Sequence, residues 1–195
     1  PKFAEAGMAV FTNAGAFRRE KDVPILLPEV NADHIDLVPE QRRNRAWKGF
    51  IVTNPNCTST GTTIVLKALQ EAFGLSRVVA VSLQAISGAG YPGVPSLDIL
   101  DNVIPHISGE EEKFAWEPMK MLGRFRGQSI EPAHFKMSTH CNRVNVSDGH
   151  LVCLTLELQK EVSPAEAVQA LAGYQAPEVC RNLPSNPRPA ISVMP

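Results

Sequence analysis

Two β-rich runs around a tight-turn signal constrain the fold of this 195-residue chain more than any other feature. The runs cover residues 139–146 and 150–160, and Asp148-Gly149 between them is typical of a two-residue hairpin turn. From Val152 to Leu158 apolar residues stand at every second position, which indicates that one face of the second strand is buried. We therefore predict an antiparallel hairpin with one face toward a core.

The register of this hairpin brings two polar residues together. Across a two-residue turn Ser147 faces His150, and Arg143 lies four residues before Ser147 on the same side of its strand. Both Arg143 and His150 then border the apolar face, where a cation and an imidazole are costly unless they bind something. A β-bulge at the turn would shift the pairing by one residue, so that Arg143 and His150 would no longer lie on one face. Taken singly, His150 also fits a surface position, and Arg143 fits a salt bridge.

A single cysteine stands in the polar segment VTNPNCTSTGTT, residues 52–63. Asn54-Pro55-Asn56 ends the preceding β-rich run, because proline lacks an N–H group and disfavours helical angles in the residue before it. A helix is expected over 58–73, with Gly74 as its stop. Free N–H groups and the dipole at the helix start favour a thiolate, so Cys57 is a candidate nucleophile. The alternative is a buried structural cysteine, which is the role expected for Cys141, Cys153 and Cys180.

The remaining patterns predict an α/β protein. Short strands are expected in residues 8–15 and 49–54, and an extended segment that fits a strand in 186–195. The β-rich run of 77–87 is followed by a loop of glycine and proline, and a helix is expected within 109–125. Ser163 and Glu166 form the signature of a capping box at the start of a last helix.

Composition excludes several classes of partner. The formal net charge is -1 and charged residues make up 20%, so we expect neither a nucleic-acid nor a membrane partner. The wide spacing of the 4 cysteines fits neither a zinc site nor a disulfide framework, so we expect reduced thiols and no metal. The first residues lack the order of a secretory signal, which favours a cytoplasmic protein.

Four motifs in order resemble those of the aspartate-β-semialdehyde dehydrogenases of fungi and archaea: TNPNCTSTG, ISGAGYPGVPSLDILDNVIP, GEEEK and CNRVNVSDGH. The resemblance runs from about residue 5 to the end. It implies a fold of the glyceraldehyde-3-phosphate dehydrogenase type: a mixed, largely antiparallel sheet with helices on one face, preceded by the remnant of a parallel nucleotide-binding sheet. It also implies NADP as cofactor, a small-molecule substrate with phosphate, and a homodimer or homotetramer.

The resemblance divides the chain in two. Residues 1–55 correspond to the end of the NADP-binding domain, and residues 56–195 to the catalytic and dimerisation domain. The family's glycine-rich Rossmann turn and its glycine-rich C-terminal helix have no counterpart in the sequence. We therefore expect a fragment that holds the nucleophile but largely lacks the cofactor site.

The resemblance also implies a role for particular residues. Cys57 corresponds to the nucleophile that takes the acyl group of aspartyl phosphate as a thioester, and His150 to the general acid and base. Gln84 corresponds to the residue that orients the thioacyl group, and Arg143 to the clamp on the substrate α-carboxylate. The substrate- and phosphate-binding residues of the family match Glu110, Lys113, Arg18 and Asn56, and its cofactor-binding residues match Ser87 and Gly88.

Such an enzyme reduces aspartyl phosphate for the synthesis of lysine, threonine and methionine. Three alternatives remain at this stage. A malonyl-CoA reductase uses a similar thioester route, but its substrate has no amino group for Glu110 to bind. A dimerisation module without activity would need no reactive Cys57. A cysteine hydrolase would use Cys57 and His150 and leave Gln84 and Arg143 unexplained.

Overall fold

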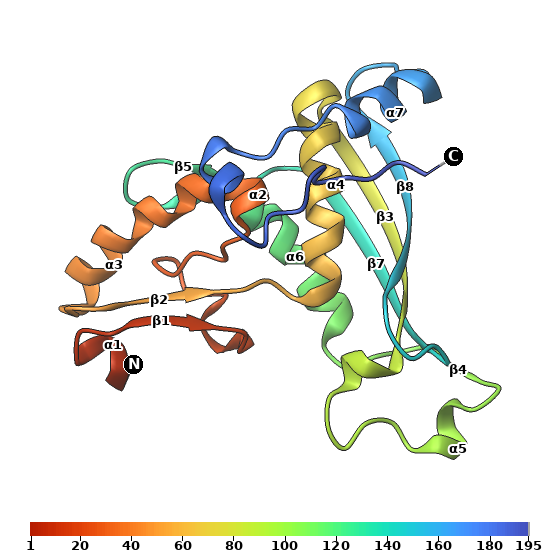
Figure 1. Cartoon of the computed structure of the whole chain (residues 1–195), viewed down its shortest axis with the longest axis horizontal. Helices are drawn as coiled ribbons and strands as arrows, with labels where there is room; N and C mark the ends of the chain where they lie inside the picture. The colour runs from red at the N-terminus through yellow and green to blue at the C-terminus, as the bar shows by residue number, and fades with distance from the viewer. Residues whose placement is uncertain (195) are drawn as a thin grey trace.

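A computed structural model describes residues 1–194 and shows a four-stranded sheet with helices on one face (Figure 1). The strand order is β4-β7-β3-β8. β3 (Leu75–Gln84) pairs parallel with β7 (Lys136–Val144) and antiparallel with β8 (Leu151–Leu158), and β4 (Val103–Ile104) pairs antiparallel with β7. Two of the three pairings are antiparallel, so the predicted mixed, largely antiparallel sheet is confirmed.

The predicted hairpin is wrong, because β3 lies between β7 and β8. The connection 145–150 crosses the end of β3, where the N–H groups of Ile86 and Ser87 donate to the carbonyl oxygens of Val146 and Ser147 at 2.8 and 3.1 Å. This arrangement gives the central strand a hydrogen-bonded neighbour on both edges. Gly149, with a φ of 85°, bends a wide connection and not a two-residue turn.

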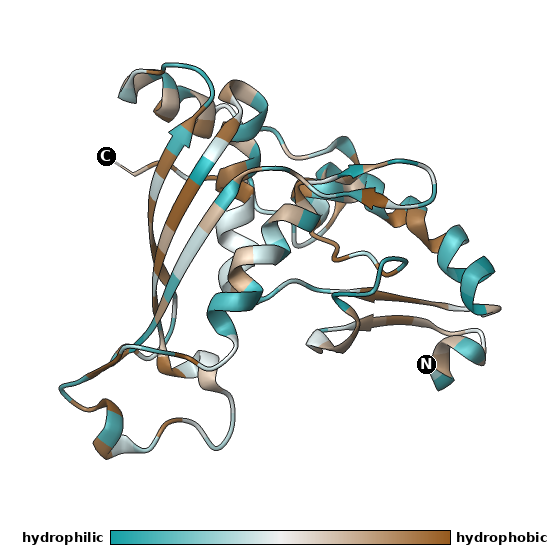
Figure 2. Cartoon of the chain, turned by 180° about the vertical axis from the view of Figure 1, so that it is seen from behind, coloured by the Kyte–Doolittle hydropathy of each residue, from teal (hydrophilic) through white to brown (hydrophobic). Residues whose placement is uncertain are grey.

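Apolar side chains of the sheet and of two helices form the main core. α4 (Cys57–Phe73) and α6 (Glu110–Met121) cover the sheet face to which β8 contributes its alternate apolar residues, as predicted. The alternation of hydrophobic and hydrophilic residues along the strands is visible in Figure 2. α7 (Pro164–Ala172) packs against α4, and its predicted capping box is present, with Ser163 and Glu166 bonded to each other's backbone N–H.

A smaller unit lies beside the sheet. β1 (Ala9–Thr12) and β2 (Phe50–Thr53) pair in parallel, as expected for the remnant of a parallel sheet. A one-turn helix, α1 (Lys2–Glu5), precedes the strand that the sequence placed first, and α3 (Val38–Arg45) forms in a segment for which no helix was expected. The other short elements are α2 (Pro28–Asn31), α5 (Ser96–Ile99), β5 (Arg124–Phe125), β6 (Ile130–Glu131) and the 3-10 turns Gly15–Phe17, Ala32–Leu37, Ile86–Ala89 and Glu178–Asn182.

Two further expectations are wrong. Residues 186–194 form no strand, and Pro187 and Pro189 in this segment have no N–H to donate to a sheet. Cys153 is exposed, because its position in the alternation of β8 turns it away from the helices. All four cysteines are free, and Cys141 and Cys180 are buried as expected. Burial raises the pKa of the Cys141 thiol.

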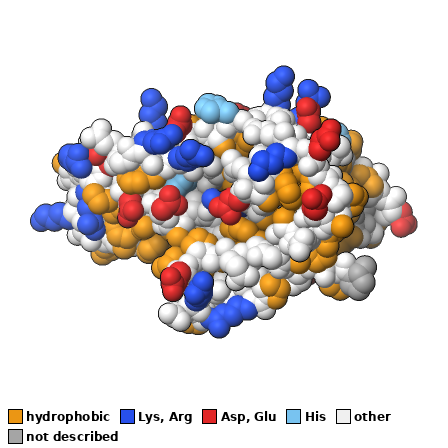
Figure 3. All heavy atoms as spheres, turned by 90° about the horizontal axis from the view of Figure 1, so that it is seen from above, with side chains coloured by type: hydrophobic (Ala, Val, Ile, Leu, Met, Phe, Trp, Pro, Cys, Tyr) orange, Lys and Arg blue, Asp and Glu red, His pale blue; other side chains and the backbone are white. Residues whose placement is uncertain are grey.

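The surface carries charges of both signs with hydrophobic patches between them (Figure 3). Among residues 1–194 no helix is both long enough and apolar enough to traverse a lipid bilayer. The same residues contain no cluster of histidine, cysteine and carboxylate side chains that is suited to a metal ion.

Candidate active site

Cys57 is the first residue of α4, one residue before the predicted helix start, and is exposed. Asn56 is the N-cap: its backbone is extended, and its side-chain oxygen accepts from the N–H groups of Thr58 at 3.0 Å and Ser59 at 3.4 Å. This cap satisfies two of the free N–H groups at the helix start. The cysteine sulfur therefore sits at the positive end of a 17-residue helix.

His150 faces this sulfur. Its Nε2 lies 3.3 Å from Cys57 Sγ, and its Nδ1 accepts from the backbone N–H of Ala85 at 3.1 Å. Because Nδ1 is an acceptor in this bond, a neutral ring carries its proton on Nε2, toward the sulfur. The imidazole is therefore placed to give a proton to a group that is bound at the sulfur.

Arg143 reaches the same backbone segment from the other side. Its Nη1 donates to the carbonyl oxygen of Ala85 at 2.7 Å, and the residue is only 5% exposed. Arg143 and His150 thus meet around Ala85, although through the end of β3 and not through the predicted hairpin. A Cβ on Gly88 would lie 2.7 Å from Arg143 Nη1 and 3.0 Å from His150 Cε1, so a side chain at 88 would displace the arginine or the histidine.

Gln84 is the last residue of β3, directly before Ala85, and Ser87 lies two residues after Ala85. Gln84 is 1% exposed and is the register partner of Arg143 on β7. Its side-chain amide donates to Ser82 Oγ at 3.2 Å, and no hydrogen bond within residues 1–194 joins it to Cys57. Ser87 is exposed in the 3-10 turn Ile86–Ala89.

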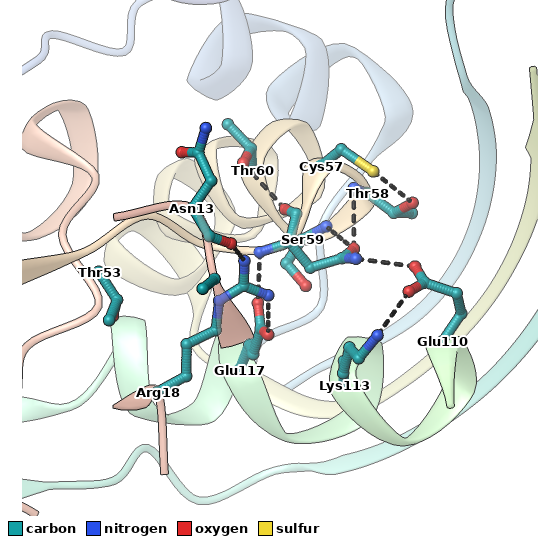
Figure 4. Close-up of polar contacts among 12 residues, drawn as sticks. Asn13, Arg18, Thr53, Cys57, Thr58, Ser59, Thr60, Glu110, Lys113 and Glu117 are labelled. Carbon is teal, nitrogen blue, oxygen red and sulfur yellow. Dashed lines mark hydrogen bonds and ion pairs between the residues drawn. The ribbon is translucent and has the colours of Figure 1, made fainter. Parts of the chain in front are cut away.

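α6 contributes the predicted Glu110 and Lys113 pair (Figure 4). Lys113 Nζ donates to Glu110 Oε1 at 2.9 Å, and Asn56 Nδ2 donates to Glu110 Oε2 at 2.7 Å. Burial alone would raise the pKa of the Glu110 carboxyl, but the hydrogen bonds from Lys113 and Asn56, together with the charges of Lys113 and Arg143, lower it below its ordinary value. A carboxylate and an ammonium group therefore lie next to the helix cap that precedes Cys57.

Arg18 points into the protein toward a residue that sequence reasoning missed. Its guanidinium donates to Glu117 Oε1 at 2.8 Å and to the carbonyl oxygen of Asn13 at 2.7 Å (Figure 4). Glu117 is completely buried, and its Oε2 accepts from the backbone N–H of Asn56 at 2.6 Å. The available signal was its spacing, since Glu117 lies two helical turns after Glu110 on the same face of α6.

A hollow of about 340 Å³ opens beside the sulfur, between α4 and β8. It is lined by Cys57, Thr58, Gly61, Thr62, Val65, His150, Val152 and Leu154. A larger hollow, of about 570 Å³, lies between Trp116 and Ile130 and includes neither the cysteine nor the histidine. The smaller hollow is therefore the one that offers a thiol and an imidazole to a small ligand.

The fold and the site together define an α/β protein with a cysteine and histidine pair at the amino end of a helix. Comparison with known families agrees: residues 66–193 match the family model described as semialdehyde dehydrogenase, dimerisation domain, and residues 1–38 match semialdehyde dehydrogenase, NAD binding domain. The chain belongs to the semialdehyde dehydrogenase family.

Individual relatives carry a more specific name. An aspartate-semialdehyde dehydrogenase of Archaeoglobus fulgidus is 50% identical over 193 residues, which are 99% of this chain and 55% of the relative. The crystal structure of aspartate semialdehyde dehydrogenase with NADP from Candida albicans is 41% identical, with a TM-score of 0.79 over 89% of this chain and 51% of that one. Aspartate semialdehyde dehydrogenase II complexed with ASA from Vibrio cholerae is 27% identical, with a TM-score of 0.71 over 88% of this chain and 55% of that one. The chain spans about half the length of the relatives it matches.

Proposed function

We propose that this chain carries the cysteine site of an NADP-dependent aspartate-semialdehyde dehydrogenase, which converts aspartyl 4-phosphate into aspartate semialdehyde and phosphate. The observation that carries the proposal is the 3.3 Å contact between Cys57 Sγ and His150 Nε2 at the start of α4. The names of the relatives, in particular the archaeal one at 50% identity, support the substrate.

Cys57 performs the first step, in which its thiolate attacks the acyl carbon of the substrate. The bond from this carbon to the phosphate oxygen breaks, phosphate leaves with the electron pair, and a thioester to Cys57 remains. Gln84 orients the thioacyl group. Before this step His150 Nε2 can donate a hydrogen bond to the sulfur, from which it lies 3.3 Å away.

Charged side chains around the sulfur bind the remainder of the substrate. Arg143 offers a planar set of N–H donors to the substrate α-carboxylate. Glu110 is kept ionised by its neighbours and so attracts the substrate ammonium group. Lys113, Arg18 and Asn56 are assigned to the phosphate side of the substrate. For Arg18 this role requires a donor beyond those that bind Glu117 and Asn13.

The exposed turn Ile86–Ala89 fits a cofactor next to the thioester. It consists of small residues after Ile86, and Gly88 leaves the surface over Arg143 and His150 free of a side chain. We assign Ser87 and Gly88 to NADP binding. When bound, NADPH supplies the hydride that reduces the thioester carbon. His150 then gives the Nε2 proton to the substrate oxygen and takes it back as the aldehyde forms, so that the sulfur of Cys57 leaves as a thiolate.

The assembly follows from the same proposal. Residues 1–55 represent part of the cofactor domain and residues 56–195 the catalytic and dimerisation domain, in line with the two family models. The uncovered sheet face exposes Val79 and Leu151, at 40% and 57%, and suits a homodimer or a homotetramer.

We further place the enzyme in the cytoplasm and in the synthesis of lysine, threonine and methionine.

The alternatives have less support. The relatives named above are aspartate-semialdehyde dehydrogenases and not malonyl-CoA reductases. An ionised Glu110 beside Cys57 also suits a substrate with an ammonium group. A dimerisation module without activity would have no need of the His150 to Cys57 contact.

The experiment uses the full-length protein with aspartate semialdehyde, NADP and phosphate, and follows NADPH by its absorbance. Cys57→Ser should abolish turnover, and His150→Asn should lower kcat by about 10²- to 10⁴-fold. Cys153→Ser, on the opposite face of the sheet, should keep the activity and is the matched control. Turnover that persists in Cys57→Ser, or a wild-type enzyme that reduces malonyl-CoA but not aspartyl phosphate, would refute the proposal.

A further inference from the structure

Two carboxylates of α6 hold the residue that precedes Cys57. Glu110 Oε2 accepts from the side-chain Nδ2 of Asn56 at 2.7 Å, and Glu117 Oε2 accepts from the backbone N–H of the same residue at 2.6 Å. The carboxylates are two helical turns apart, so they approach Asn56 from neighbouring points on one helix face. The N-cap of α4 is thus fixed through both its backbone and its side chain.

Glu117 has no direct access to a ligand. It is 0% exposed, and Arg18, the partner of its Oε1, is itself buried. A buried ion pair of this kind is seldom more stabilising than two apolar side chains of similar volume, because both charges lose their hydration. Stability alone therefore does not account for a carboxylate at this position.

Arg18 ties the same carboxylate to the smaller unit of the protein. Its Nη2 donates to the carbonyl oxygen of Asn13, and Asn13 Oδ1 accepts from Asn54 Nδ2 at 2.6 Å. Lys120, one turn after Glu117, donates to the carbonyl oxygens of Arg18 and Glu20, both at 2.7 Å. The loop after β1, the segment before Cys57 and α6 therefore meet at the Arg18 and Glu117 pair.

We propose that Glu117 is a positioning residue for Cys57: it holds the Asn56 backbone so that the sulfur stays against His150, and Arg18 is its counter-ion. The inference rests on the proposed function, since it concerns the nucleophile assigned there. Glu117 accepts a hydrogen bond from the N–H of Asn56, the residue directly before Cys57. Loss of this bond would free the backbone at the start of α4. The 3.3 Å contact of Cys57 Sγ with His150 Nε2 then loses its support.

The test measures iodoacetamide alkylation of Cys57 relative to Cys153 at neutral pH, by peptide mass spectrometry on the native chain. Both thiols are exposed, and Cys153 lies on the other sheet face, so at a fixed pH the ratio cancels differences in reagent concentration and reaction time. Glu117→Gln keeps the side-chain length but leaves one oxygen for two donors. We expect the ratio to fall roughly tenfold, since small displacements of a reacting group lower rates strongly.

Two further variants test whether a lower ratio comes from the lost hydrogen bond and not from misfolding or from the loss of a negative charge on α6. Arg18→Met with Glu117→Met removes both charges together, so no unpaired charge is buried if Glu117→Gln fails to fold. This double variant should still unfold cooperatively in urea, although the Asn56 N–H loses its acceptor, and its ratio should stay low. Glu112→Gln is the matched control, because Glu112 is on the same helix and pairs with Arg19 at the surface, with its side chain 74% exposed. Its ratio should be unchanged.

The outcomes distinguish this inference from the proposed function. A wild-type ratio near one would contradict the assignment of Cys57 as nucleophile. A high wild-type ratio that Glu117→Gln leaves unchanged, or that the double variant restores, would overturn the positioning role alone.

Discussion

The N-cap residue Asn56 allows its two side-chain interactions to be measured separately. Its oxygen caps α4 through Thr58 and Ser59, and its Nδ2 donates to Glu110 at 2.7 Å. Asn56→Ala removes both interactions. Loss of an N-cap costs about 1 kcal/mol, and a half-buried carboxylate that loses a donor adds about 1 kcal/mol. We expect a decrease of about 2 kcal/mol in the free energy of unfolding.

Asn56→Ser is the matched variant, because serine caps a helix about as well as asparagine but is too short to reach Glu110. It should lose only about 1 kcal/mol, the cost of the missing donor. For a chain of this size the two losses correspond to a fall in Tm of about 4–8 °C for alanine and about 2–4 °C for serine. Thermal and urea unfolding would measure both. Equal losses in the two variants would refute the cap, and a serine variant as stable as wild type would refute the bond to Glu110.

Three further predictions concern separate parts of the protein. Burial lowers the pKa of His34 below 6.5, so below pH 6.5 the unfolded state binds a proton more readily than the folded state. The free energy of unfolding, measured by urea titration, should therefore fall by up to about 1.4 kcal/mol for each pH unit below 6.5. His34→Gln should reduce this fall. Gly88→Ala places a Cβ 2.7 Å from Arg143 Nη1 and should lower kcat/KM of the full-length enzyme about tenfold. Gly15→Ala, with open space around its Cβ, should not change kcat/KM. Ser163→Ala removes the capping box and should cost about 1 kcal/mol in urea unfolding.

The sequence predicted the elements whose causes are local. The helix predicted over 58–73 is observed as Cys57–Phe73 with Gly74 as its C-cap, and the predicted capping box of α7 is present. Both follow from caps, proline and glycine within a few residues. The pairing of β7 with β8 was predicted wrongly, because turn residues report only local geometry. Insertion of β3 between them depends on contacts with residues about 60 to 80 positions away.

In the candidate site, too, the residues with a local sequence signal were predicted and those that depend on distant contacts were not. The sequence suggested Cys57 and His150 as candidate site residues, and the structure places their side chains 3.3 Å apart. Glu117 was missed because a single glutamate in a helix is usually a solvated charge, and only the fold shows that α6 buries it against Arg18. A buried charged residue can be predicted from a sequence only when its partner is known, and the partner of Glu117, Arg18, lies ninety-nine residues away.

The measurement that tests the account most directly is the alkylation rate of Cys57 in the wild-type chain and in His150→Asn, with Cys153 as internal standard. If the sulfur is activated by His150 and by the start of α4, wild-type Cys57 should react at neutral pH at least about ten times faster than Cys153, and His150→Asn should remove most of this difference. Equal rates for the two cysteines in the wild-type chain would contradict the claim that Cys57 is a nucleophile activated by its place in this fold.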